Sequence, residues 1–132
     1  MVLDTSALVA ILTGEPEGPS LIDAIEAAEA RLLSAATLVE TSIVIESRYG
    51  PEGVRDLDLF LAAAGAAVIA VDADQAEVAR RAFSRFGKGR HPAALNFGDC
   101  FSYALAVTRA EPLLFKKGAD FDHTDVEPML RG

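Results

Sequence analysis

Short apolar runs alternate along this chain with longer stretches in which apolar residues recur every three or four positions. The short runs are typical of strands buried on both faces, and the longer stretches are typical of amphipathic helices. The predicted strands are residues 1–4, 31–35, 67–71 and 112–115. Five predicted helices are residues 5–12, 20–30, 37–49, 53–64 and 98–109. A sixth begins after a cap at Asp72 or Asp74 and ends at Phe86. Residues 87–97 are predicted to be an irregular loop.

Strands that alternate with helices predict an α/β fold, in which a central parallel sheet carries helices on both faces as a three-layer sandwich. The 132 residues suit one domain, residues 1–132, large enough to bury its own core. Sites in such sheets form beyond the carboxyl ends of the strands. Asp4 ends the first predicted strand and Asp120 follows the last, so we expect both at the same edge.

Three carboxylates lie within apolar segments. Asp4 ends the run Met1–Leu3, Glu40 lies inside residues 36–45, and Asp99 opens the segment 100–107. Acidic side chains are rarely buried unless they are paired or bind a metal. A hard divalent cation would hold such carboxylates together against their mutual repulsion. The pattern therefore predicts a metal-dependent site, with phosphodiester hydrolysis as its expected use.

Each acid also has a plainer interpretation. Asp4 and Asp99 both precede helical segments and are possible N-caps, while Glu40 and Ser47 together would form a narrow polar stripe on a surface helix. Asn96, three residues before Asp99, favours the functional interpretation.

Composition and charge add further expectations. The single cysteine, the lack of an export leader and the absence of an apolar run long enough to span a bilayer indicate a cytoplasmic protein. The net charge of −8 argues against a nucleic-acid substrate, but a basic run follows residue 79. Its bases, with the histidine that follows them, are Arg80, Arg81, Arg85, Lys88, Arg90 and His91. All of these except Arg81 are candidates for guiding an RNA backbone. The alternative is that Arg80, Arg81 and Arg85 form a solvated helix face.

Taken together, five segments resemble the PIN domain and, within it, the VapC-type toxin ribonucleases of toxin–antitoxin pairs. These segments are Met1–Leu8, Ala36–Glu40, Asn96–Cys100, Pro112–Lys116 and Gly118–Asp125. The resemblance implies a Mg²⁺- or Mn²⁺-dependent acidic site whose family positions map onto Asp4, Glu40, Asp99 and Asp120. Asp4 and Asp99 would be the primary metal ligands, with polar support from Thr5, Ser6 and Asn96. One departure is Gly118, where many PIN domains carry a further Asp.

The activity that this resemblance implies is endonucleolytic cleavage of single-stranded or structured RNA such as tRNA. It also implies a VapB-type antitoxin, for which residues 36–45 and 53–64 offer apolar surfaces, as they do for a homodimer. Two other functions remain open. One is a phosphatase-like enzyme with Asp4 as nucleophile, although Ser6 stands where such sites usually place a second Asp. The other is a non-catalytic protein-binding module.

Overall fold

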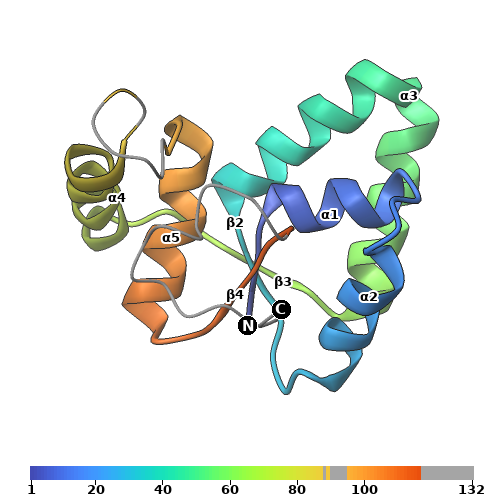
Figure 1. Cartoon of the computed structure of the whole chain (residues 1–132), viewed down its shortest axis with the longest axis horizontal. Helices are drawn as coiled ribbons and strands as arrows, with labels where there is room; N and C mark the ends of the chain where they lie inside the picture. The colour runs from blue at the N-terminus through green and yellow to red at the C-terminus, as the bar shows by residue number, and fades with distance from the viewer. Residues whose placement is uncertain (88, 90–94, 117–132) are drawn as a thin grey trace.

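The computed structural model describes residues 1–87, 89 and 95–116. Its core is a parallel four-stranded sheet in the order β3-β2-β1-β4 (Figure 1). The strands are β1 (Val2–Leu3), β2 (Leu32–Ser34), β3 (Ala67–Ile69) and β4 (Leu113–Leu114). All four fall within predicted strand segments, and Val2 pairs with Leu32 on one side and Leu113 on the other.

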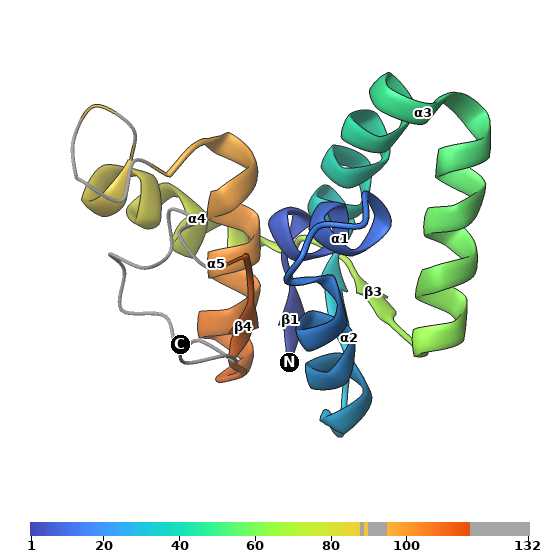
Figure 2. The same cartoon turned by 45° about the vertical axis from the view of Figure 1, so that its right-hand side comes forward.

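Helices cover both faces of the sheet, with α4 and α5 on one face and α1, α2 and α3 on the other (Figure 2). The helices are α1 (Thr5–Leu12), α2 (Gly18–Ala27), α3 (Ala35–Ala64), α4 (Ala73–Phe86) and α5 (Phe97–Arg109). The predicted three-layer α/β sandwich is confirmed.

The two predicted helices 37–49 and 53–64 are the two arms of α3. They meet at Gly50, whose φ of 71° and ψ of −163° are not helical. A positive φ is inexpensive only for glycine, and Pro51 cannot donate the next backbone hydrogen bond. The break therefore lies where the Gly50-Pro51 pair predicts it.

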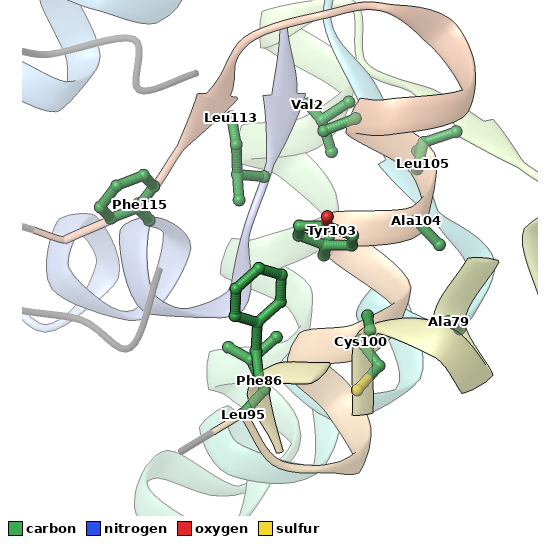
Figure 3. Packing of buried hydrophobic residues seen from close by; sticks show 12 residues of the cluster. Val2, Ala79, Phe86, Leu95, Cys100, Tyr103, Ala104, Leu105, Leu113 and Phe115 are labelled. Atoms are coloured by element: carbon green, nitrogen blue, oxygen red, sulfur yellow. The ribbon is translucent and has the colours of Figure 1, made fainter. Parts of the chain in front are cut away.

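The sheet divides the core into two clusters of buried side chains. In β1, Val2 belongs to the cluster beneath α4 and α5, while Leu3 belongs to the cluster beneath α1, α2 and α3, and neither is exposed. Leu113 and Leu114 of β4 divide in the same way. Figure 3 shows Val2 and Leu113 beside Tyr103 in the first cluster. Burial on both faces explains why these strands are apolar without alternation.

Several sequence predictions fall partly or wholly outside the described residues. Gly87, which begins the predicted loop, and Leu95, two residues before its end, form an isolated parallel bridge. Four predicted site residues lie outside the described residues: Lys88, Arg90, His91 and Asp120. Among the helices that are described, none is long and apolar enough to cross a membrane.

Candidate active site

Asp4 lies at the carboxyl end of β1 and is almost fully buried, with 2% of its surface exposed. Its Oδ2 accepts a hydrogen bond of 2.9 Å from the Ser6 amide, which makes Asp4 the N-cap of α1. Its Oδ1 is also buried, and no described residue donates a hydrogen bond to it. Burial raises the pKa of Asp4, and the Ser6 amide with the nearby hydroxyls of Ser102 and Ser6 offsets part of that cost, without a hydrogen bond to Oδ1. The capping interpretation is therefore correct but leaves one carboxylate oxygen unexplained.

Glu40 lies on the first arm of α3 and is directed at the start of α1. The Thr5 hydroxyl donates a 2.5 Å hydrogen bond to Glu40 Oε1. Partial burial raises the pKa of Glu40, and the negative charge of Asp4 raises it further. The two carboxylates are thus close enough to repel each other. Ser47 is exposed, whereas Glu40 is half-buried and bonded to Thr5, so Glu40 is not simply a surface residue of a polar stripe.

Asp99 lies in the first turn of α5 and directly follows Gly98, the residue at which this helix approaches the Glu40 carboxylate. It is not the N-cap, so that alternative was wrong: Asn96 Oδ1 accepts from the Asp99 amide at 2.9 Å, and Asp99 Oδ2 accepts from the Asn96 amide at 3.0 Å. This reciprocal capping box uses the Asn96 side chain to start the helix. The polar role predicted for Asn96 is therefore structural support for the turn that carries Asp99.

Gly98 sets how closely α5 approaches Glu40. A Cβ atom added at this position would overlap the Glu40 carboxylate, with Oε2 as its nearest atom. Any residue other than glycine would have to push the carboxylate away or move the helix. Nothing in the sequence marks this glycine, because the close contact is between segments far apart in the chain.

Four buried or half-buried hydroxyl groups join the three helices around the acids. The Thr41 hydroxyl donates to Thr5 Oγ1 at 3.0 Å. The hydroxyls of Thr37 and Ser102 share a hydrogen bond of 3.1 Å between α3 and α5. Thr37 and Thr41 were not among the predicted site residues. The available signal was two threonines that flank Glu40 in an apolar helical segment.

The end of β4 is tied to the same edge of the sheet. The Asp4 amide donates to the Leu114 carbonyl at 3.0 Å, and the Lys116 amide donates to Ser6 Oγ at 3.0 Å. Lys116 Nζ also lies 2.6 Å from a Glu15 carboxylate oxygen, and this contact helps raise the pKa of Lys116. Ser6 therefore holds the last strand beside Asp4, at the edge where the sequence predicted Asp120 to follow.

The described members of the basic run that follows residue 79 lie on α4. Arg80 and Arg81 are exposed and form ion pairs with Glu77 at 3.1 Å and 3.4 Å. The Arg85 guanidinium lies 4.7 Å from the centre of the Phe86 ring. Arg80 and Arg81 thus fit the solvated helix face that was the alternative interpretation. Guidance of RNA by this segment stays a prediction.

The donor set suits a hard divalent cation. Within the described part of the chain, no three acidic, histidine or cysteine side chains are grouped closely enough to hold a metal ion. Mg²⁺, however, keeps several of its waters and takes only one or two carboxylates from the protein. A bound cation would give Asp4 Oδ1 the partner that it lacks among the described residues. It would also offset the repulsion between Asp4 and Glu40.

Cys100 is a buried core residue. Burial, with a smaller contribution from Asp99, raises the pKa of its thiol to about 11. The thiol is therefore protonated at neutral pH, as expected for a small buried hydrophobe.

Comparison with known proteins gives one consistent result. Residues 1–127 match the PIN domain family. The chain is 59% identical over 126 residues to Ribonuclease VapC of Mycolicibacterium smegmatis, covering 96% of this chain and 97% of that protein. It is 55% identical over 126 residues to Ribonuclease VapC30 of Mycobacterium tuberculosis, covering 96% and 95%.

Solved structures share the fold at low sequence identity. Mycobacterium tuberculosis VapC20, a toxin that cleaves the sarcin-ricin loop, matches with a TM-score of 0.73 and 19% identity over 96% of this chain and 98% of its own. A toxin–antitoxin complex from Klebsiella pneumoniae matches with a TM-score of 0.70 and 16% identity over 94% and 92%. By family match and by identity to its relatives, the chain belongs to the PIN-domain family and, within it, to the VapC ribonucleases.

Proposed function

We propose that this protein is an endoribonuclease toxin that uses a divalent cation, Mg²⁺ or Mn²⁺, held at the edge of the sheet where β1 ends. The observation that carries the proposal is the buried Asp4 carboxylate, whose Oδ1 has no donor among the described residues and whose neighbour Glu40 is also acidic. A site of this kind is unfavourable without a positive charge and favourable with one.

Asp4 and Asp99 would hold the cation, with Glu40 and Asp120 reaching it directly or through water. When bound, such an ion lowers the pKa of a coordinated water and offsets charge on the phosphate oxygens. The chain contributes orientation: Ser6 holds Asp4, Thr5 holds Glu40, and the capping box holds Asp99. The substrate would be single-stranded or structured RNA, such as tRNA.

The proposal includes two protein partners and a place in the cell. A VapB-type antitoxin is expected because the relatives are named VapC and one structural neighbour is a toxin–antitoxin complex. The first arm of α3 exposes 58% of Val39 and 59% of Ile43, and its second arm exposes 62% of Leu59. Exposed apolar side chains of this size suit a protein interface, with the antitoxin or with a second copy in a homodimer. All of these partners would be met in the cytoplasm.

Metal removal tests the proposal directly. After exhaustive chelation, we expect cleavage of a tRNA pool by the purified toxin to stop, and to return when Mg²⁺ or Mn²⁺ is added. Calorimetry should also show Mn²⁺ binding that Asp4→Asn weakens. RNA cleavage that persists in excess chelator would contradict the metal-dependent site. A chain that neither binds Mn²⁺ nor cleaves RNA would instead be the non-catalytic module.

Replacing Arg85, Lys88 and Arg90 together with Ala should weaken RNA binding without changing the affinity for Mn²⁺. The reason is that phosphate contacts release counterions, so each lost contact reduces the slope of log affinity against log salt by about 0.7 for single strands. The measurement is RNA affinity at several salt concentrations, with a catalytically inactive Asp4→Asn background to prevent cleavage.

The control for this experiment removes three exposed arginines elsewhere, Arg48, Arg55 and Arg109, which changes the net charge by the same amount. If both triple variants flatten the slope equally, the effect is one of total charge. An unchanged slope in the first variant would mean that RNA approaches by another face.

A further inference from the structure

Three hydroxyl groups on the described helices bond to their own helix. The hydroxyls of Ser42, Ser47 and Thr108 donate to the carbonyl four residues earlier, at distances of 2.7, 2.7 and 2.8 Å. This local bond is the common solution for Ser and Thr in a helix. Thr41 differs from these three, because it is completely buried and its hydroxyl reaches Thr5 on α1.

The direction of the bonds around Thr5 follows from counting protons. A threonine hydroxyl has one hydrogen to donate and can accept through its lone pairs. Thr5 gives its hydrogen to Glu40 Oε1, since an ionised carboxylate can only accept. The Thr41 hydroxyl must therefore donate to Thr5, and the three groups form a hydroxyl relay that runs from Thr41 through Thr5 to Glu40.

This hydroxyl relay determines which oxygen of Glu40 faces which neighbour. Oε1 is held on the α1 side by Thr5, and Oε2 is the atom nearest to Gly98 at the start of α5. If Thr5 lost its donor and turned to another partner, the carboxylate would be free to rotate. The side chain would then sample orientations in which neither oxygen faces the turn that carries Asp99.

Packing alone does not require a threonine at position 41. Its position in α3 is completely buried, where valine has nearly the same shape and would cost no unsatisfied hydroxyl. A hydroxyl there needs a partner, and the partner that it has is the group that holds Glu40.

We propose that Thr41 is a positioning residue of the active site, which acts through Thr5 to fix the orientation of the Glu40 carboxylate toward the start of α5. The inference rests on the proposed metal-dependent function and extends it to a residue that touches neither the cation nor the RNA.

The test compares Thr41→Val, which removes the hydroxyl at constant shape, with Thr41→Ser, which keeps it. Mutating a group that orients a metal ligand typically reduces metal affinity by about 10–100-fold. Thr41 lies one hydrogen bond further from Glu40 than Thr5, the group that holds the carboxylate directly. We therefore expect Thr41→Val to weaken Mn²⁺ binding by about 3–10-fold and Thr41→Ser to stay within about 2-fold of the parent chain. Thr108→Val is the matched control, because it removes a hydroxyl that bonds its own helix, and should leave Mn²⁺ affinity unchanged.

A double-mutant cycle with Thr5→Val makes the result independent of the stability of any one variant. If the relay carries the effect, adding Thr41→Val to Thr5→Val should cause no further loss of Mn²⁺ affinity. The proposal would be overturned if the losses of Mn²⁺ affinity in the two single variants multiplied in the double variant. It would also be overturned if Thr41→Val bound Mn²⁺ as tightly as the parent chain while Glu40→Gln bound it weakly. If Glu40→Gln and Asp4→Asn both leave Mn²⁺ affinity unchanged, the metal-dependent function itself is wrong.

Discussion

Asp4→Asn and Asp99→Asn should each reduce metal-dependent RNA cleavage by at least about 10²-fold while the protein stays folded. Asparagine keeps an oxygen that can accept the Ser6 amide at position 4 and the Asn96 amide at position 99. Both helix starts therefore survive. What is lost is the negative charge, which the proposed cation needs.

Asp4→Asn should also maintain or raise the free energy of unfolding in the absence of metal. Burial raises the pKa of Asp4 in the folded chain above its value in the unfolded chain, so the charged form opposes folding at neutral pH. Asparagine removes that charge. Urea denaturation in chelator measures the change, and Asp58→Asn, an exposed acid on the second arm of α3, is the control. A variant that unfolds, or one that cleaves at the parent rate, would show that the site is assigned incorrectly.

Gly98→Ala should impair both stability and cleavage, because the new methyl group would occupy the space of the Glu40 carboxylate. Overpacking of this kind costs about 1–3 kcal/mol of unfolding free energy. Displacing a site group by about 1 Å can reduce the rate by about 10²-fold. Thermal or urea denaturation and RNA cleavage under saturating Mn²⁺ measure the two effects.

Two further variants identify the cause. Gly18→Ala, where an added Cβ would make only ordinary contacts of 3.6 and 3.7 Å with α1, should be tolerated. Adding Glu40→Asp to Gly98→Ala shortens the acid by one methylene group and should recover stability without recovering full cleavage. If Gly98→Ala behaves like Gly18→Ala, then α5 does not need its close approach to Glu40.

The elements of this fold could be predicted because each depends on local chemistry. The apolar run before Asp4 is a strand, and the Gly50-Pro51 pair breaks α3 where the sequence indicated. The acids Asp4, Glu40 and Asp99 stood out for a similar reason: each is a charge in an otherwise apolar segment.

Contacts between distant segments could not be predicted. One missed contact is local: Glu77 pairs with Arg80 and Arg81, three and four residues later in α4, and this helical spacing was available in the sequence. The N-cap of α5 was placed at Asp99 as an alternative because aspartate is common there, whereas the structure places Asn96 at the cap. The bond from Thr41 to Thr5 depends on how α3 packs against α1, which no spacing in the sequence indicates.

The three carboxylates of the proposed site share a feature that bears on the entropy of binding. Each has one oxygen held by a donor from the protein: the Ser6 amide for Asp4, the Thr5 hydroxyl for Glu40 and the Asn96 amide for Asp99. Immobilising a free side chain at an interface costs about 0.5–1.5 kcal/mol. For these acids that loss accompanies folding, before any ligand arrives. The proposed site is thus preorganised, and a cation or an RNA phosphate that bound there would meet side chains whose conformational freedom has already been reduced.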